Sequence, residues 1–73
     1  MENRKIREIL IQETWEVYRL LPHFYQERCR MVFLDIVNQI QNCHDAEELD
    51  EFIGINFGIS LEEWIQTHLK KEN

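Results

Sequence analysis

The sequence has few of the residues that break or crosslink a chain. Its 73 residues include two glycines, one proline and two cysteines. So little glycine and proline excludes a collagen-like or low-complexity chain. Two cysteines are too few for the disulfide framework of a small secreted domain. We therefore expect a cytoplasmic protein with reduced thiols. A Cys29–Cys43 disulfide would form only in an oxidising compartment.

Long apolar runs are also missing. No stretch of the sequence approaches the ~20 apolar residues that a membrane-spanning helix requires. The basic residues near the start, Arg4, Lys5 and Arg7, are not followed by the apolar stretch of a signal peptide. The sequence therefore predicts a protein without a membrane partner.

The motifs of catalysis and metal binding are absent as well. No phosphate loop, G-x-G-x-x-G, H-E-x-x-H or C-x-x-C pattern occurs. The residues that could ligate a metal are His23, Cys29, Cys43, His44 and His68. Cys43 and His44 are adjacent in sequence, and adjacent residues rarely both ligate one metal ion. Ser60 and His68 cannot act as a nucleophile and its base, because they lie about two helical turns apart. We predict no enzyme activity, no cofactor and no metal.

Apolar residues recur at spacings of three and four, which is typical of amphipathic helices. Pro22, the segment 42–45 and the glycine-containing segment 54–60 interrupt this pattern. The expected helices cover roughly residues 3–21, 23–42, 46–57 and 61–71. A chain of this size has room for one domain, so we predict a single all-α domain over residues 1–73. It would be a small bundle of about four helices, with two longer antiparallel helices and a short C-terminal helical hairpin.

Signals for helix ends support the last two helices. Asp45 precedes Glu48 by three residues, and Ser60 precedes Glu63 by three, which is the spacing of a capping box. Gly58 is the expected left-handed stop of the third helix.

The apolar faces of the helices differ in width. The two short helices each carry one narrow stripe, in which Trp64 is an expected core residue. In the third helix the stripe consists of Leu49, Phe52, Ile53 and Phe57, and in the fourth of Leu61, Trp64, Ile65 and Leu69. The first helix carries a core stripe of Ile6, Ile9, Leu10, Val17, Leu20 and Leu21. The second helix places Tyr25, Cys29, Val32, Phe33, Ile36, Val37 and Ile40 on one side.

The first helix also has a second apolar strip, formed by Ile11, Trp15 and Tyr18, well round the cylinder from Ile6. Packing against one core accounts for only one apolar strip of the first helix. The second strip therefore predicts an interface with another protein or with a second copy. The alternative is that the C-terminal hairpin covers the second strip.

The charge is unevenly distributed. The formal net charge is −6, and the segment from Asp45 to Glu63 holds seven acidic residues and no basic one. Acids in first helical turns stabilise the helix ends. They also create a field that repels nucleic acid and attracts a basic protein surface. A helix-turn-helix DNA-binding motif in the last two helices is disfavoured, because the helix that would contact the bases begins with acidic residues.

Together these features predict a small acidic, non-enzymatic protein-binding module. It would act as an inhibitor, adaptor or regulator that docks on a larger, partly basic protein. The expected partner-binding residues are Ile11, Trp15, Tyr18, Glu47, Asp50 and Glu51. Size and charge would also suit a modulator encoded by a phage or mobile element. The alternatives are a homo-oligomeric structural or assembly protein, including a homodimer, and, less favoured, a transcription regulator that contacts DNA directly.

Overall fold

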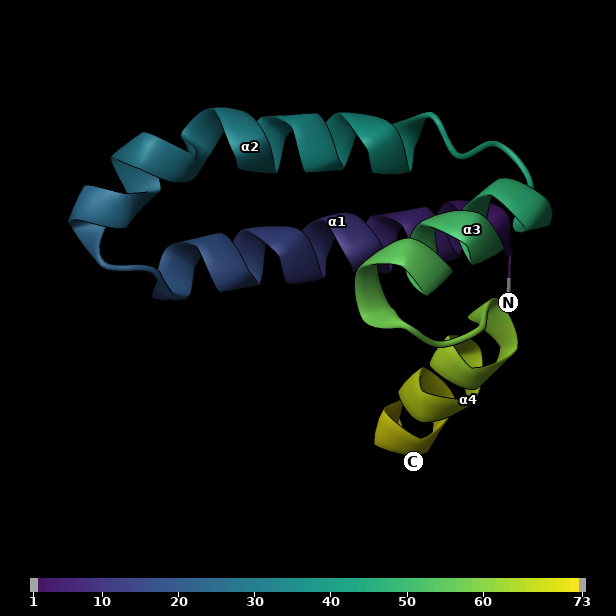
Figure 1. Cartoon of the computed structure of the whole chain (residues 1–73). Helices are drawn as coiled ribbons and strands as arrows, with labels where there is room; N and C mark the ends of the chain where they lie inside the picture. Colours follow the sequence, from purple (N-terminus) through teal and green to yellow (C-terminus); the bar gives the residue numbers. More distant parts are fainter. Residues whose placement is uncertain (1, 73) are drawn as a thin grey trace.

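Four helices and no strand make up the part of the chain that the structure describes. The structure is a computed structural model that describes the backbone of residues 2–72 and the side chains of residues 2–68. The helices are α1 (Asn3–Leu20), α2 (His23–Gln41), α3 (Ala46–Phe57) and α4 (Leu61–Glu72) (Figure 1). The predicted all-α fold is confirmed, and each predicted helix end agrees with the observed one to within one residue.

A two-residue turn joins α1 to α2, and local sequence explains its position. Leu21 precedes Pro22, and the proline ring disfavours a helical conformation at the residue before it. Accordingly α1 ends at Leu20, and Leu21 is extended, with φ −71° and ψ 143°. Helix α2 starts immediately after Pro22, so α1 and α2 lie side by side and run in opposite directions (Figure 1).

Side chains close this turn. The Gln26 side-chain amide donates to the carbonyl oxygens of Tyr18, Arg19 and Leu21, with nitrogen–oxygen distances of 3.2, 3.3 and 3.0 Å. The Tyr18 hydroxyl donates in turn to the Gln26 carbonyl at 2.8 Å. Carbonyls in the last turn of a helix lack partners within the helix. Gln26 supplies partners to those of α1 and holds the two helices together.

The N-cap bond of each predicted capping box is present in α3 and α4, whereas the described residues show no return bond to the Glu48 or Glu63 side chain. The Glu48 N–H donates to the Asp45 carboxylate at 2.9 Å, and the Glu63 N–H donates to the Ser60 hydroxyl at 3.1 Å. Gly58 has φ 72° and follows α3 as its left-handed C-cap. The short-range signals in the sequence therefore set these helix boundaries.

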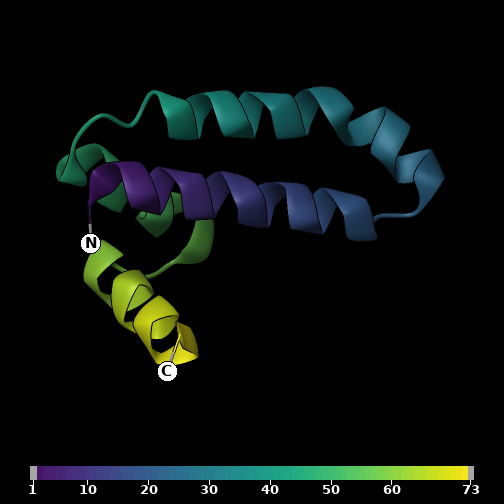
Figure 2. The ribbon, with the colours of Figure 1, turned by 180° about the vertical axis from the view of Figure 1, so that it is seen from behind.

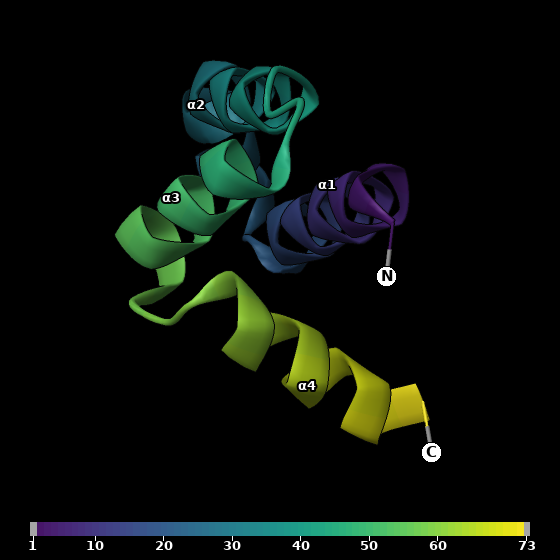
Figure 3. The same cartoon turned by 90° about the vertical axis from the view of Figure 1, so that its right-hand side faces the viewer.

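The core lies at one end of the α1–α2 hairpin, where α3 and α4 pack against it (Figures 1 and 3). Trp64 is 3% exposed, so its predicted place in the core is confirmed. The other buried apolar residues are Ile6, Leu10, Val37, Ile40, Cys43, Leu49, Phe52 and Ile53. We call this end of the hairpin the covered half. The end that contains the turn extends past α3 and α4 (Figure 2), and we call it the uncovered half.

The predicted core stripes are therefore wrong in the uncovered half. Val17 is 54% exposed and Leu20 is 84% exposed. Tyr25, Val32 and, at the end of α3, Phe57 are also exposed. The reason is where the short helices lie: α3 and α4 have 12 residues each, against 18 in α1 and 19 in α2, and both lie at the end of the hairpin opposite its turn (Figure 1). A 12-residue helix laid along the hairpin would already be about 10 Å shorter than it at 1.5 Å per residue, and α4 instead runs across the hairpin (Figures 1 and 3). The predicted core position of the Leu69 side chain lies outside the described side chains.

Candidate functional site

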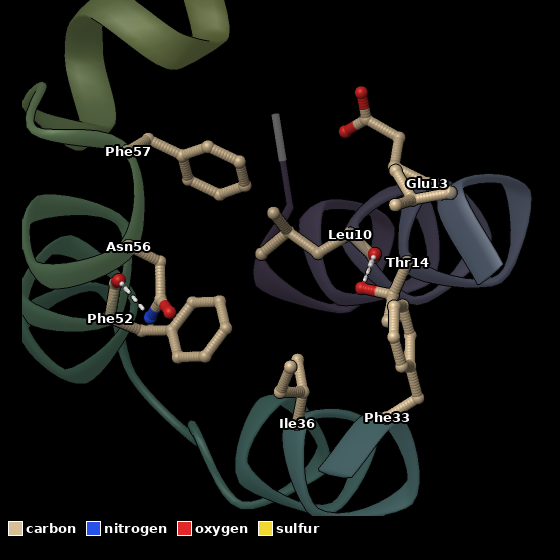
Figure 4. A pocket seen from close by; sticks show the side chains of 9 residues that line it. Leu10, Glu13, Thr14, Phe33, Ile36, Phe52, Asn56 and Phe57 are labelled. Atoms are coloured by element: carbon tan, nitrogen blue, oxygen red, sulfur yellow. Dashed lines mark hydrogen bonds between the residues drawn. The ribbon is translucent and has the colours of Figure 1, made fainter. Parts of the chain in front are cut away.

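An apolar groove of about 330 Å³ opens where the covered half meets the uncovered half. Three helices form it: α1 and α2 contribute one wall each, and the C-terminal half of α3 contributes the third (Figure 4). Its lining residues are Leu10, Glu13, Thr14, Val17, Phe33, Ile36, Phe52, Asn56 and Phe57.

The groove continues the hydrophobic core to the surface. Leu10 and Phe52 are buried at its base, and the aromatic rings of Phe52 and Phe57 reach across from α3 toward Leu10 (Figure 4). Val17 and Phe57 are about half exposed at its mouth. An opening of this kind offers apolar contact area that is already partly desolvated, which is typical of sites that accept an apolar anchor.

The polar lining groups are largely satisfied within the protein. The Thr14 hydroxyl donates to the Leu10 carbonyl at 2.8 Å, and the Asn56 side-chain amide donates to the Phe52 carbonyl at 2.8 Å. Glu13 is the one charged residue of the lining. The groove thus presents apolar surface and a single carboxylate.

Glu13 also connects α1 to α4. Its Oε1 lies 3.1 Å from His68 Nε2, and His68 Nδ1 lies 2.8 Å from the Trp64 carbonyl oxygen. The His68 ring stacks on the Trp64 indole with centroids 3.7 Å apart. This arrangement ties the Glu13 carboxylate to α4.

A second exposed apolar region lies at the turn of the hairpin. We call residues 19–31 the tip. Its apolar residues with more than half of their surface exposed are Leu20, Phe24, Tyr25 and Met31. The tip contains three arginines and one glutamate, and the Arg28 guanidinium lies 5.1 Å from the centroid of the Phe24 ring. The tip is therefore both apolar and basic.

The predicted second strip of α1 is half-buried. Ile11 packs against the core. The Tyr18 ring packs edge-on against Phe33 of α2 with centroids 5.1 Å apart, and Trp15 packs edge-on against Tyr18 at 5.5 Å. The strip thus contributes to the contact between α1 and α2, while part of each side chain stays accessible. The proposed binding role of these three residues stays a prediction.

The predicted acidic residues lie on α3, away from that strip in sequence and on a different helix. Glu47, Asp50 and Glu51 are all exposed. Asp50 also has a structural role that the sequence pattern did not indicate: its carboxylate accepts a hydrogen bond from the Leu61 N–H at 2.8 Å. Asp50 and Ser60 therefore share the capping of α4. The proposed role of Asp50 in partner binding stays a prediction.

The cysteine and histidine side chains form no reactive or metal-binding cluster in the described residues. Within that part of the chain, no three or more His, Cys, Asp or Glu side chains are placed to hold a metal ion. Both cysteines are free, and Cys43 is buried with its thiol donating to the Gln39 carbonyl at 3.2 Å. Burial, followed by the negative charge of Glu48, raises the pKa of the Cys43 thiol.

The groove and the tip were missed by sequence reasoning, which placed Val17, Leu20 and Phe57 in the core. The available signal was the difference in length between the two helix pairs. Among the described helices, none combines the length and the apolar character needed to cross a membrane.

No protein-family model, curated protein or solved structure matches the chain.

Proposed function

We propose that this chain is a small acidic, non-enzymatic protein-binding module that docks on a larger, partly basic protein and acts as an inhibitor, adaptor or regulator. One observation carries the proposal: large exposed apolar residues gather on the uncovered half of the hairpin. They are Val17, Leu20, Phe24, Tyr25, Met31, Val32 and Leu34. Large apolar residues exposed in this number on one segment are expected where a partner covers them.

The groove supplies the specific part of this surface. Binding energy in protein interfaces is concentrated in a few aromatic or apolar anchors that fill well-packed pockets. A space of about 330 Å³ lined by Val17, Phe33 and Phe57 accepts one such anchor. Trp15, half-buried beside Tyr18, adds an aromatic contact on α1.

The acidic residues of α3 supply the electrostatic part. Glu47 and Glu51 are exposed and belong to a segment with seven acids and no base. Charges of one sign on an exposed surface raise the association rate with an oppositely charged partner more than they raise affinity. A partly basic partner fits this distribution.

A matched pair of variants tests the proposal. Phe57→Asp places a charge at the mouth of the groove, whereas Ile55→Asp places one at a 76% exposed residue of α3 outside the groove lining. The protein would be captured with its neighbours by chemical crosslinking in its native cells, and crosslinked proteins would be identified by mass spectrometry. We expect one stoichiometric partner that no longer crosslinks to the Phe57→Asp variant and still crosslinks to the Ile55→Asp variant. A partner that survives Phe57→Asp would contradict it.

A second candidate is a homo-oligomeric structural or assembly protein. The observation in its favour is that the same chain carries both an apolar groove and an exposed apolar tip. Sedimentation velocity separates the candidates, because a stable oligomer without any partner supports the second.

A further inference from the structure

The exposed apolar residues of the tip lie on both sides of the hairpin. Phe24 is 61% exposed and precedes by nine positions Phe33, which lines the groove. At about 100° per residue, two helical residues nine positions apart point in opposite directions, so Phe24 faces away from the groove. Leu20, 84% exposed, follows Val17 by three positions and lies on the groove side of α1. One flat protein surface covers one side of the hairpin, whereas a medium that the turn enters end-on covers both.

The turn forms one free end of the molecule. The hairpin extends past α3 and α4, which lie at its other end (Figures 1 and 2). Leu20 is the last residue of α1, and Phe24 is the second residue of α2. Tyr25, 53% exposed, packs edge-on against Phe24 with centroids 5.6 Å apart. Three exposed apolar side chains therefore surround the turn.

The backbone of the turn is hydrogen-bonded within the protein. The Gln26 side-chain amide donates to three carbonyls at the end of α1. The Pro22 carbonyl accepts from the N–H groups of Tyr25 and Gln26 at 2.9 and 3.1 Å, and proline has no N–H of its own. Polar backbone groups enter an apolar medium at low cost only when they have partners within the protein. The turn meets this condition at these four carbonyls.

Arginines lie behind this apolar end. Arg28 and Arg30 are exposed, and their backbone lies about 8 and 10 Å behind the first residue of α2 at 1.5 Å per residue. Arg19 lies in the last turn of α1. Glu27 is the one acid of the tip, and its Oε1 lies 3.5 Å from His23 Nε2. Amphipathic segments at a bilayer surface bury their apolar side about 5–10 Å deep, so arginines at this depth meet the lipid phosphates.

The acidic part of the chain lies at the other end. The segment from Asp45 to Glu63 holds seven acids, and its helices pack on the covered half (Figure 1). The 18 residues of α1 span about 27 Å, against a Debye length of about 10 Å at 0.1 M salt. An anionic surface at the turn therefore meets the arginines, while its repulsion of the acidic segment is screened.

We propose that the tip docks end-on against a lipid bilayer with anionic headgroups. Leu20, Phe24 and Tyr25 enter the boundary between headgroups and acyl chains, and the arginines contact the lipid phosphates. The sequence prediction of no membrane partner rests on spanning segments and signal peptides, and a peripheral contact needs neither. The proposal goes beyond the proposed function, because the groove and the acids of α3 stay available to a partner protein at the bilayer surface.

The test mixes the full chain with vesicles of phosphatidylcholine that contain about one third phosphatidylserine, and with vesicles of phosphatidylcholine alone. Co-sedimentation at low salt measures the bound fraction. The wild type should bind the anionic vesicles at least about tenfold more tightly than the neutral ones, and added salt should weaken that binding. A wild type that sediments with neither kind of vesicle would overturn the proposal, as would equal binding to both.

Variants on the two sides of the hairpin test the end-on geometry. Leu20→Asp on the groove side and Phe24→Asp on the other side should each weaken vesicle binding at least about tenfold. The matched controls are Ile55→Asp, at a 76% exposed residue of α3, and Phe57→Asp, at the mouth of the groove. Both should bind like wild type, and a thermal melt by circular dichroism checks that each variant stays folded. A loss confined to Leu20→Asp would contradict the end-on contact, and so would an equal loss with Ile55→Asp.

A fluorescent reporter locates the inserted end without adding a charge. Phe24→Trp and Ile55→Trp share Trp15 and Trp64 as a common background. Lipids brominated on their acyl chains quench a tryptophan that they contact. Anionic vesicles that contain such lipids should therefore quench Phe24→Trp more strongly than Ile55→Trp. Equal quenching of the two variants would show that the tip does not insert.

This proposal and the proposed function fail separately. A chain that binds vesicles through its tip but crosslinks to no protein keeps the lipid contact and overturns the docking on a larger protein. A chain that binds no vesicles and crosslinks to a protein, with the crosslink lost in both Phe24→Asp and Phe57→Asp, assigns the tip to that protein and overturns the lipid contact.

Discussion

The two halves of the α1–α2 hairpin have the same kind of sequence and different surroundings. In the covered half, Ile6 and Leu10 meet α3 and α4 and are almost fully buried. In the uncovered half, Val17 and Leu20 continue the same face and remain exposed. An apolar stripe therefore indicates which face of a helix can pack, whereas the position and direction of the neighbouring helices decide which part of that face is covered (Figures 1 and 3).

This difference divides the chain into a part that sustains folding and a part available for binding. Substitutions in the covered half should lower the free energy of unfolding. Substitutions in the uncovered half should lower association with little cost to the fold.

Trp64→Ala should have the largest effect. Trp64 is 3% exposed and joins α4 to the core, so removing its ring should cost ~3–5 kcal/mol of unfolding free energy. Urea denaturation followed by circular dichroism measures this. Phe24→Ala, at an exposed aromatic residue of the tip, is the control and should unfold near the wild-type midpoint. Similar losses in both variants would remove the distinction between the halves.

Trp15→Ala should act mainly on association. Trp15 is half-buried and contacts Tyr18 edge-on, so its loss should weaken self- or partner-association by ~2 kcal/mol if it is an interface hot spot. It should destabilise the fold less than Trp64→Ala does. Sedimentation velocity and a urea melt of the same variant check both parts. Normal association by a folded Trp15→Ala protein would defeat the interface prediction for this strip.

The two cysteines offer a chemical comparison of the halves. Cys43 is buried in the covered half, and burial raises its pKa. Its thiol is therefore protonated at neutral pH, and only the thiolate reacts. Cys29 is half-buried in α2. At pH 7.5 a thiol-specific reagent should modify Cys29 at least about tenfold faster than Cys43. The separate variants Cys29→Ser and Cys43→Ser assign the two rates, and equal rates would show that the covered half opens readily.

Asp50→Ala should cost ~1 kcal/mol of stability, because it removes the carboxylate that accepts from the Leu61 N–H. Ser60→Ala should cost a similar amount through the Glu63 N–H. Glu47→Ala is the matched control on α3 and should be nearly neutral, since an exposed charge contributes little to stability. If Glu47→Ala were as costly as Asp50→Ala in a thermal melt, the capping role of Asp50 would be wrong.

Leu20→Ser should have the smallest effect on folding. Leu20 is 84% exposed, so the change should move the unfolding free energy by less than about 0.5 kcal/mol. The measurement must be made on dilute, monomeric protein, because a dimer adds stability through mass action. A loss above 1 kcal/mol in the monomer would mean that the uncovered half contributes to the fold.

Sequence reasoning succeeded where structure is set by neighbours along the chain. The caps at Asp45 and Ser60 and the stop at Gly58 depend on residues three or four positions away, and all three are present. Trp64 was placed correctly because its helix has one apolar direction. These features could be predicted because a helical period and a capping distance are fixed by backbone geometry.

The candidate site depends on contacts distant in sequence and was therefore missed. Asp50 meets the N–H of Leu61 eleven positions away, a contact that needs the relative placement of α3 and α4. Phe57 lines a groove together with Val17 and Phe33. No periodic pattern in the sequence indicates where the end of α3 lies relative to α1. The pairing of Tyr18 with Phe33 likewise follows from the angle between two helices.

The hydrogen bonds around Gln26 have a consequence for the thermodynamics of binding. The short turn is held by the Gln26 amide on one side and the Tyr18 hydroxyl on the other, so the tip is preorganised before it meets any partner. Ordering the backbone of a mobile loop costs about 1–2 kcal/mol per residue, and the turn has already lost this backbone entropy during folding. Gln26 thus lowers the backbone part of the entropic cost of association, although it need not touch the partner.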